Sequence, residues 1–366
     1  MSETIVALSR SASEPFELVP AQLLGPRDGE VLLRVEACGV CHTDMEGRAV
    51  LASPCVVGHE VVGVVESVAP DVSDYVVGDR VIASYPHCGE CSSCRTGRPF
   101  HCRDVMQLIF GGARADGSPT LLIDGEPAGA AFFQQSGFAT HALVPERSLV
   151  PAPADIPSQL LAALPCGIQT GAGAVFNVFA PSSRDSLVVF GAGAVGLAAV
   201  MAASVVGMAK VVAVDLVDDR LDLAKELGAT RVVHAGKEDV NLALRSALPD
   251  GARFVLDTVG IDATWQQAIA CIGVGGTFGY VTIPRPEATY SVHMSPLFER
   301  FVTLQAIHNG SAVPRDFLPK LESLYRSGQF PIDRLVRAYP FDQIDKAFAD
   351  AGKGQSVKPV LVMEGF

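Results

Sequence analysis

Residues 186–220 read SLVVFGAGAVGLAAVMAASVVGMAKVVAVDLVDDR, and more of the architecture can be predicted from this stretch than from any other. It opens with an apolar β-branched run, 187–190, which is typical of a buried strand. The glycine-rich residues 191–196 follow, and then an uncharged run with helical character. A second apolar run, 210–214, ends on Asp215. The order strand, glycine turn, helix, strand and acid predicts a dinucleotide-binding βαβ unit.

Each glycine of the turn has a physical task in such a unit. Gly191 permits the tight turn, Gly193 lets the backbone approach a pyrophosphate, and Gly196 lets helix and strand pack closely. The helix N-terminus offers free N–H groups and a positive dipole to the phosphates. Asp215 can accept both ribose hydroxyls and repel a 2′-phosphate, which favours NAD over NADP. The cofactor-binding residues predicted here are Gly191, Gly193, Ala194, Val195, Gly196 and Asp215.

The same stretch is compatible with two alternative structures. Residues 187–206 carry no charge, so their length alone would also suit a membrane helix. The early glycines and the second strand with its acidic end argue against a membrane helix. The glycines could also be ordinary loop residues of an α/β protein. A cofactor site accounts for all the features together, so it is the preferred hypothesis.

Composition limits the class of protein. A chain of 366 residues is expected to form about two domains with a large core. With 19% charged and 49% hydrophobic residues it is globular rather than disordered. The net charge of −12, without a basic run, speaks against nucleic acid or a membrane as partner. No basic segment leads into an apolar core near Met1, so the expected location is the cytoplasm.

The two parts of the chain differ in the pattern of secondary structure that they predict. Residues 1–155 are expected to be mostly β, because alternating or Val-rich runs are typical of strands. These expected strands are 30–36, 60–68, 80–83 and 138–144, with a long excursion containing a hairpin at 103–137. From about Ser158 strands alternate with helices, which predicts a doubly wound parallel sheet with helices on both faces. The last stretch, with helices near 314–327 and 341–351 and a strand near 359–362, is expected to return to the first domain.

The cysteines carry the most specific signal. Nine cysteines in a long chain without a secretion signal point to metal or catalysis rather than to disulfides. Four of them, at close spacing, can complete a tetrahedral shell, which suits a structural zinc ion without an open position. These four are Cys88, Cys91, Cys94 and Cys102. The alternatives are unrelated cysteines in a reduced protein and a redox Cys-x-x-Cys motif, which needs only two.

Three more residues could form a second metal site. The thiolates of Cys41 and Cys166 with the imidazole of His59 would leave a fourth place on zinc for water or substrate. Spacing alone does not decide this. A histidine beside valines is also typical of a satisfied core residue, and Cys166 could simply be packed.

Taken together, these motifs resemble the zinc-dependent medium-chain alcohol dehydrogenases. The motifs occur in the order expected for that family and span nearly the whole chain: Cys41-His42-Thr43-Asp44, Gly58-His59-Glu60, the four cysteines, Pro165-Cys166-Gly167 and Gly191–Gly196. Phe132–Thr140 and Cys166–Ala174 are most similar to bacterial aryl-alcohol (benzyl alcohol) dehydrogenases.

The resemblance implies an α/β fold of two domains. It places a GroES-like, β-rich catalytic domain at 1–167, with a structural zinc lobe at 86–103. A Rossmann domain that binds NAD is implied at 168–305, and a segment completing the catalytic domain at 306–366. It also implies two zinc ions per chain and a homo-oligomer, a tetramer in most bacterial relatives and a dimer in others.

The resemblance also assigns roles to individual residues. Cys41, His59 and Cys166 would bind the catalytic zinc, and the four clustered cysteines the structural zinc. Asp44 would hold His59, Glu60 would be an acid near the metal, and Thr43 would accept the alcohol proton. Further contacts with the cofactor are implied for His42, Thr170, Arg220, Ile283 and Lys358, and a substrate pocket for Ser84, Tyr85 and Phe133, with Ile283 also near it. Without the family, His42 could be a solvated loop residue, and Arg220 and Lys358 surface charges.

Two residues depart from the family pattern. Glu46 stands where many relatives have the histidine that ends a proton relay, so Glu46, His42 or water could serve instead. Val61 stands where the family usually has glycine, so the local packing must differ.

The implied activity is reversible, NAD-linked oxidation of primary aromatic or allylic alcohols to aldehydes, by hydride transfer from a zinc-bound alkoxide to nicotinamide. The alternatives are a glutathione-dependent formaldehyde dehydrogenase, a broad-specificity alcohol dehydrogenase or a polyol dehydrogenase. A non-catalytic cofactor-binding relative is the alternative outside the enzymes. The sequence does not decide which alcohol is used or in which direction the reaction runs.

Overall fold

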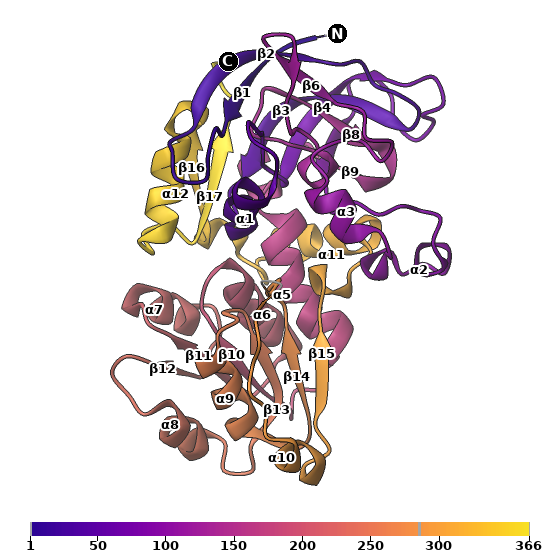
Figure 1. Cartoon of the computed structure of the whole chain (residues 1–366). Coiled ribbons are helices and arrows are strands. Elements are labelled where there is room, and N and C mark those ends of the chain that lie inside the picture. The colour runs from indigo at the N-terminus through magenta and orange to yellow at the C-terminus, as the bar shows by residue number, and fades with distance from the viewer. Residues whose placement is uncertain (1, 285–286, 366) are drawn as a thin grey trace. The chain divides into compact units, whose positions relative to one another are not determined.

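The computed structural model describes residues 2–284 and 287–365, and the chain forms two compact units (Figure 1). The first unit holds the chain up to Cys166, the segment Val313–Lys320 and the C-terminal part from Ile332. The second holds Gly167–Ala312 and Leu321–Pro331. We describe each unit by itself.

The first unit is built on two β-sheets. The larger has the order β16-β17-β3-β4-β5-β9, with β8 paired to β3. The smaller has the order β1-β2-β6-β7, and its strands are antiparallel. The strands of the large sheet are β3 (Glu30–Gly39), β4 (Val61–Val68), β5 (Arg80–Ala83), β8 (His141–Pro145), β9 (Leu149–Pro151), β16 (Val336–Pro340) and β17 (Lys358–Val362). Those of the small sheet are β1 (Ser2–Leu8), β2 (Glu17–Leu23), β6 (Leu121–Ile123) and β7 (Glu126–Pro127).

Short helices connect these strands. They cover the sheets rather than form a layer of their own, because most are too short to bury a broad face. They are α1 (His42–Val50), α2 (Ser92–Arg95), α3 (Val105–Phe110), α4 (Ser158–Leu161) and α12 (Ile344–Gly352). Single turns occur at Pro99–His101, Phe132–Gln134, Glu146–Ser148, Ile332–Arg334 and Phe341–Gln343. The core of this unit includes Phe138 and Tyr85 from the N-terminal part and Leu361 from the C-terminal part.

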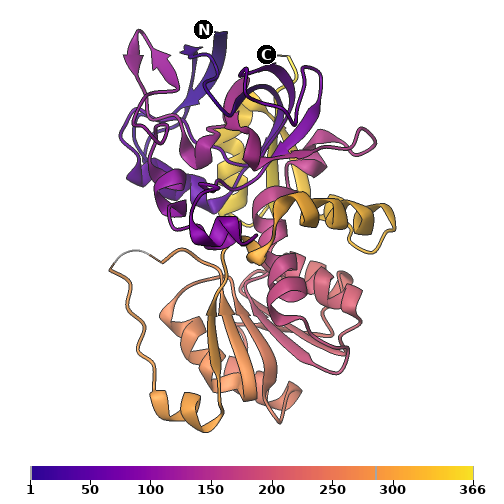
Figure 2. The ribbon, with the colours of Figure 1, turned by 90° about the vertical axis from the view of Figure 1, so that its right-hand side faces the viewer.

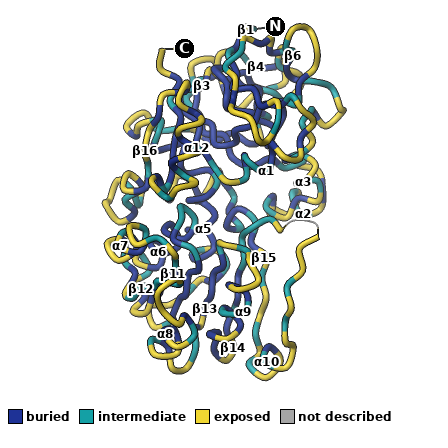
Figure 3. The backbone as a smooth tube through the Cα atoms, turned by 60° about the vertical axis from the view of Figure 1, so that its left-hand side comes forward, coloured by how far each residue is buried: buried dark blue, intermediate teal, exposed yellow. Residues whose placement is uncertain are grey.

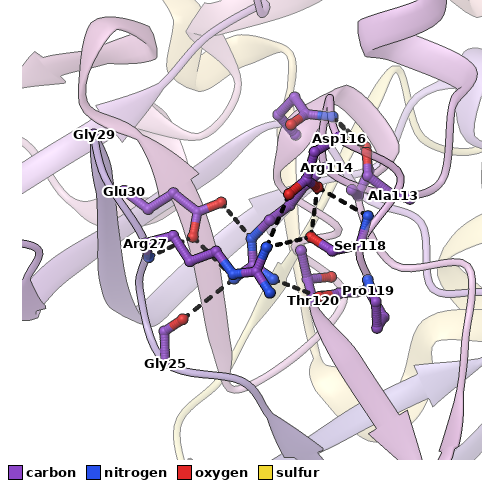
Figure 4. Close-up of polar contacts among 12 residues, drawn as sticks. Gly25, Arg27, Gly29, Glu30, Ala113, Arg114, Asp116, Ser118, Pro119 and Thr120 are labelled. Atoms are coloured by element: carbon purple, nitrogen blue, oxygen red, sulfur yellow. Dashed lines mark hydrogen bonds and ion pairs between the residues drawn. The ribbon is translucent and has the colours of Figure 1, made fainter.

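The predicted excursion 103–137 is held by a buried ion pair as well as by apolar residues that join the cores, among them Ile109, Leu121 and Phe132. Arg114 is 7% exposed and binds Glu30 of β3 through both carboxylate oxygens, at 2.8 and 2.9 Å (Figure 4). It also donates to the carbonyl oxygens of Gly25 and Pro119. The hairpin expected in this stretch is formed by β6 and β7. A buried guanidinium with a fork-like carboxylate partner can fix a loop that has few apolar residues.

The second unit is a parallel sheet with the order β12-β11-β10-β13-β14-β15, and Figure 2 shows helices on both of its faces. All its strand pairs are parallel, as the alternating pattern predicts. The strands are β10 (Ser186–Phe190), β11 (Lys210–Asp215), β12 (Arg231–His234), β13 (Ala252–Asp257), β14 (Ile272–Tyr280) and β15 (Thr303–Ala306). The helices are α5 (Gln169–Gly173), α6 (Ala194–Val206), α7 (Asp218–Glu226), α8 (Val240–Ala247), α9 (Asp262–Cys271) and α10 (Met294–Glu299), with irregular helical turns at Ala174–Phe179 and Asn309–Ser311. The helical turn Leu164–Ile168 is divided between the two units.

The glycine turn has the predicted geometry. Gly191 has a φ of +91°, which an L-residue rarely adopts. A side chain at Gly196 would meet the carbonyl oxygen of Gly191 at 1.8 Å, so the start of α6 packs directly on the turn. A β-carbon at Gly193 would meet no atom within 4 Å, which leaves room for a ligand to approach the backbone.

Two sequence-based expectations differ from the structure. The strand expected at 138–144 is regular only from His141, because Ala139 makes an isolated bridge to Val6 in the small sheet. The division of the chain also differs from the expected boundaries, because α11 (Pro314–Arg326) contributes its first half to the first unit and its second half to the other.

The apolar run 187–206, for which a membrane helix was one alternative, is a strand, a turn and a helix of the parallel sheet. Among the described residues, the helical run Ser158–Phe179 is long and apolar enough to cross a membrane by length and composition. In its most apolar window 78% of the residues are buried inside the protein, as in the core helix of a globular protein.

Candidate active site and cofactor site

Asp44 organises the first cluster of polar residues. It lies in the first turn of α1 and is fully buried. Its Oδ2 accepts a hydrogen bond from the backbone N–H of Cys41 at 2.8 Å, and its Oδ1 accepts one from Gly58 at 3.2 Å. The Nδ1 atom of His59 lies 2.7 Å from the same Oδ1. With Nδ1 donating to Asp44, the Nε2 lone pair of His59 is free to bind a metal ion.

The structure brings the three predicted ligands of a catalytic zinc together. The possible ligand atoms of Cys41, His59, Glu60 and Cys166 all lie within 4.8 Å of one another. His59 Nε2 is 3.4 Å from Cys166 Sγ, and two such ligands of one tetrahedral zinc would be roughly 3.5 Å apart. Two thiols and an imidazole are the donors that zinc prefers. The residues present therefore fit a zinc ion.

The electrostatics of this cluster favour a cation. The thiol of Cys166 lowers the pKa of Cys41 well below its usual value, and the pKa of Cys166 itself is raised. Burial lowers the pKa of His59, but the Asp44 carboxylate outweighs burial and raises it to about 10. Protons on Cys166 and His59 thus balance the buried anions, and a dication could replace both protons.

Glu60 and Lys358 form a buried ion pair next to this cluster. Both side chains are at most 3% exposed, and the ammonium also donates to the carbonyl oxygen of Val40 at 3.2 Å. Burial raises the pKa of Glu60 to about 7, although Lys358 opposes this shift. The contact of Lys358 with the cofactor stays a prediction. Its ammonium is enclosed in the first unit and already has a carboxylate partner.

Aromatic rings form the wall beside His59. Phe133 stacks on the imidazole, with ring centroids 4.2 Å apart and planes 19° apart, and Phe132 meets it edge-on at 5.4 Å. Phe133, Gln134 and Ser136 all have positive φ, near +50°, in one short turn. Strained backbone of this kind is found at functional sites, where the surroundings hold it in place. Phe132 was not assigned a role from the sequence, although it belongs to the stretch that resembles aryl-alcohol dehydrogenases.

The departure at Val61 is explained by Gly137. A β-carbon at Gly137 would lie 2.0 Å from Cγ2 of Val61, so the two positions cannot both carry a side chain without movement. Gln135 links two segments of the same region through its side-chain amide. Its Oε1 accepts a hydrogen bond from the N–H of Val61 at 3.4 Å, and its Nε2 donates one to the carbonyl oxygen of Ser84 at 2.9 Å. Gln135 was not predicted as a site residue, since no sequence motif marks a glutamine whose amide will be buried.

We expect Gly137→Ala to destabilise the zinc-loaded protein by about 2 kcal/mol, because overpacking in a core costs about 1–3 kcal/mol. Val61→Ala in the same chain should recover part of that loss, and the coupling between the two changes should be about 1 kcal/mol. Urea unfolding of the four proteins measures both quantities. Simple additivity of the two changes would contradict this packing.

The other predicted residues of this region lie as follows. Ser84 is fully buried, and its hydroxyl donates to the carbonyl oxygen of Pro165, next to Cys166. Tyr85 is 1% exposed, and burial raises the pKa of its hydroxyl. The charges of Cys94 and Cys102 raise this pKa further, because Tyr85 lies near the four-cysteine lobe. Thr43 lies 3.7 Å from Cys41, from hydroxyl to Sγ. His42 is exposed, and Glu46 is partly buried on α1.

The four clustered cysteines also converge. Their sulfur atoms lie within 4.8 Å of one another, with Cys91–Cys94 at 3.5 Å and Cys88–Cys94 at 3.9 Å. Two thiolates on one zinc ion would be roughly 3.8 Å apart. Hydrogen bonds from backbone N–H groups lower the pKa of Cys91 to about 6, which favours the thiolate. This donor set fits a second zinc ion, without an open position.

The cofactor residues predicted from the glycine pattern lie together in the second unit. Asp215 ends β11, where its Oδ2 accepts from the N–H of Ala192 in the glycine turn at 2.6 Å. Its Oδ1 accepts from Leu216 and Val217 at 2.7 and 2.9 Å, so the carboxylate is fixed beside the turn. Ala194 and Val195 begin α6 and are partly exposed.

Three predicted cofactor residues lie outside the glycine turn. Thr170 is 8% exposed on α5, and Ile283 follows β14 and is partly exposed. Arg220 is partly exposed on α7, and its buried Nε has no hydrogen-bond partner among the described residues.

Comparisons with known proteins agree with this geometry. The family of alcohol dehydrogenase GroES-like domains matches residues 27–154, and the zinc-binding dehydrogenase family matches residues 194–324. The chain is 41% identical to a geraniol dehydrogenase of Castellaniella defragrans over 360 residues, which is 97% of this chain and 96% of that protein. It is 33% identical to an NDMA-dependent alcohol dehydrogenase of Amycolatopsis methanolica, over 98% of this chain and 99% of that one.

Two solved structures are similar over their whole length. A zinc-binding-domain alcohol dehydrogenase protein from Burkholderia ambifaria has a TM-score of 0.95 at 42% identity, with 99% of both chains covered. Benzyl alcohol dehydrogenase from Acinetobacter calcoaceticus has a TM-score of 0.95 at 38% identity, again over 99% of both chains. With these matches and its two cysteine-containing clusters, the chain belongs to the family of zinc-dependent medium-chain alcohol dehydrogenases.

Proposed function

We propose that this protein oxidises primary aromatic or allylic alcohols to aldehydes with NAD, reversibly, and holds two zinc ions. The observation that carries the substrate class is the aromatic wall of Phe132 and Phe133 around His59. Two relatives support it, since one is named a geraniol dehydrogenase and another a benzyl alcohol dehydrogenase.

The proposed roles follow from the site. When bound, zinc supplies a Lewis acid that makes an alcohol hydroxyl more acidic, and the nicotinamide supplies the hydride acceptor. Cys41, His59 and Cys166 would hold the metal ion, and Asp44 keeps the imidazole in the tautomer that binds it. Thr43 would take the proton of the alcohol. The exposed His42, Glu46 or water would carry the proton onward, and Glu60 would be the acid nearest to the metal.

Burial of the substrate ring sets the expected selectivity. A phenyl group adds on the order of 100 Å² of apolar surface over ethanol, which at about 25 cal/mol per Å² is worth roughly 2–3 kcal/mol. When the whole difference is realised in the transition state, kcat/KM for an aromatic alcohol exceeds that for ethanol by roughly 30- to 150-fold.

The test is kcat/KM with NAD for benzyl alcohol, cinnamyl alcohol, geraniol, hexanol and ethanol. We expect the aromatic and allylic alcohols to exceed ethanol by roughly the factor above. Ethanol within a few-fold of benzyl alcohol would rule out the proposed selectivity and favour a broad-specificity enzyme. Strong dependence on glutathione with formaldehyde would assign the chain to formaldehyde dehydrogenases instead.

We expect Asp215 to set the preference for NAD. A carboxylate beside the glycine turn would repel a 2′-phosphate, and such like-charge contacts cost several kcal/mol, so NAD should be preferred about 100-fold or more. Asp215→Asn keeps the shape of the side chain and should lower that ratio at least about tenfold, and Asp215→Gly should lower it further. The ratio of kcat/KM for NAD and NADP measures the effect. A wild-type protein that uses NADP equally well would show that Asp215 does not have this role.

We also propose that the protein is a homo-oligomer, a tetramer or a dimer, that works in the cytoplasm on small-molecule alcohols and aldehydes. Strand β15 lies at the edge of its sheet, and the segment before it is largely exposed in Figure 3. Large apolar side chains that are 42–81% exposed gather there: Val274, Met294, Phe298, Phe301 and Leu304. An apolar sheet edge is typical of an interface. Sedimentation velocity should show a smaller species for Phe298→Asp than for the wild type or the surface control Val76→Asp.

A further inference from the structure

Gly47 stands in helix α1 at a position where glycine is unfavourable for the helix itself. It lies inside α1 and is buried. Glycine in a helix interior is less stable than alanine, because it loses more backbone freedom when the chain folds. The helical backbone at this position does not require glycine. What requires a residue without a side chain is therefore the group that packs against Gly47.

The ring of Phe132 fills the space beside Gly47. A β-carbon at Gly47 would lie 2.7 Å from Cε2, 2.9 Å from Cζ and 3.2 Å from Cδ2 of Phe132. Carbon atoms in favourable contact are about 3.5 Å or more apart, so the ring would have to move by roughly 0.8 Å to admit this atom. Glycine thus lets Phe132 lie directly against the helix.

The surroundings of Phe132 leave its ring little freedom to move elsewhere. Phe132 is fully buried, its N–H donates to Oγ of Ser136 at 3.0 Å, and its carbonyl oxygen accepts from the N–H of Ser136 at 3.0 Å. Three rings surround its own, with centroid distances of 5.9 Å to Phe110, 4.9 Å to Phe133 and 5.4 Å to His59. Because a core is closely packed, a shift of Phe132 is passed on to these neighbours.

Helix α1 holds the imidazole and the ring beside it at the same time. Asp44 and Gly47 are three residues apart in α1, so they lie on one face of the helix. Asp44 fixes His59 through the 2.7 Å contact of Oδ1 with Nδ1, while Gly47 contacts the ring that meets His59 edge-on. The imidazole is thus tied to α1 by a hydrogen bond. The position of Phe132 depends instead on the thickness of the helix at Gly47.

We propose that Gly47 is a positioning residue for the aromatic wall of Phe132 and Phe133, and that it thereby sets the selectivity for alcohols that carry a ring. This inference rests on the proposed function, because it takes the wall to receive the substrate ring. A β-carbon at position 47 would push Phe132 toward the space that the ring of benzyl alcohol uses. Ethanol has no ring to place there, so its oxidation reports on the rest of the site.

The experiment compares the ratio of kcat/KM for benzyl alcohol to kcat/KM for ethanol, with NAD, in four zinc-loaded proteins. These are the wild type, Gly47→Ala, Phe132→Leu and the double variant. Gly47→Ala should lower the ratio about tenfold, since a misplacement of about 1 Å can cost as much as a hundredfold in rate. In the Phe132→Leu background the same change should alter the ratio by less than about threefold, because the smaller side chain leaves room for the β-carbon.

The thermal midpoint gives a second readout that does not depend on activity. Gly47→Ala should lower the midpoint when Phe132 is present, because the β-carbon and the ring compete for the same space. In the Phe132→Leu background it should leave the midpoint unchanged or raise it, since alanine favours the helix. Gly352→Ala is the matched control, because Gly352 also lies in a helix of the first unit and its β-carbon would meet no atom within 4 Å. It should keep the wild-type ratio and zinc content.

The outcomes separate this inference from the proposed function. A wild type that prefers benzyl alcohol, together with a folded Gly47→Ala variant of unchanged ratio, would overturn the inference and leave the proposed function standing. A wild type without that preference would overturn both. A loss of ratio that is as large in the Phe132→Leu background would show that Gly47 does not act through the ring. This last comparison decides the matter if Gly47→Ala alone does not fold.

Discussion

Cys166→Ser should abolish alcohol oxidation while leaving the protein folded. Its Sγ atom lies 3.4 Å from His59 Nε2 in a cluster that fits a zinc ion with an open fourth position. A serine hydroxyl is a poor zinc ligand at neutral pH, so the variant should lose this ion. The Lewis acid contributes several kcal/mol to such reactions, and we expect kcat/KM for benzyl alcohol to fall about 10³-fold or more.

The zinc content distinguishes this result from unfolding. Cys166→Ser should retain about one zinc ion per chain, held by the four-cysteine lobe, and its circular dichroism spectrum should match that of the wild type. Cys55→Ser is the matched control, because Cys55 is also fully buried in the first unit but does not belong to a metal-binding group. That control should keep about two zinc ions and activity within a few-fold. Full activity of Cys166→Ser would refute the assignment of the catalytic zinc.

Cys94→Ser should reduce stability instead of acting directly on turnover. Cys94 lies within 3.5–3.9 Å of Cys91 and Cys88, sulfur to sulfur, in a lobe whose helices are only a few residues long. Such a short segment has no core of its own, so metal binding provides much of its folding free energy. We expect a loss of about 3–5 kcal/mol, which lowers the thermal midpoint by roughly 10 °C or more.

The measurement is differential scanning calorimetry of the zinc-loaded proteins, together with metal analysis. Cys271→Ser is the control here, since Cys271 is buried in α9 and its thiol donates to the carbonyl oxygen of Ala268. It should keep both zinc ions. If Cys94→Ser keeps two zinc ions and the wild-type midpoint, the lobe does not hold a structural metal ion.

The two clusters differ in how far the sequence predicts them. The four cysteines stand close together in the chain, so short loops bring them together whatever the rest of the fold does. Cys41, His59 and Cys166 are far apart, and on spacing alone a packed core accounts for them equally well. The resemblance to a family favoured that set and implied that Asp44 holds His59. The structure adds that the same buried Asp44 also accepts a hydrogen bond from the Cys41 backbone.

By itself, the sequence determined the parallel sheet, the glycine turn and the acid at the end of β11, because these follow from local periodicity and from backbone conformations that only glycine adopts easily. The tertiary structure decided what depends on contacts between distant segments. It placed Lys358 against Glu60, fitted Val61 into the space that Gly137 leaves, and stacked Phe133 on His59. Each of these is a contact across more than sixty residues of chain. No local pattern records such a contact, since the burial and close packing that fix it exist only in the folded protein.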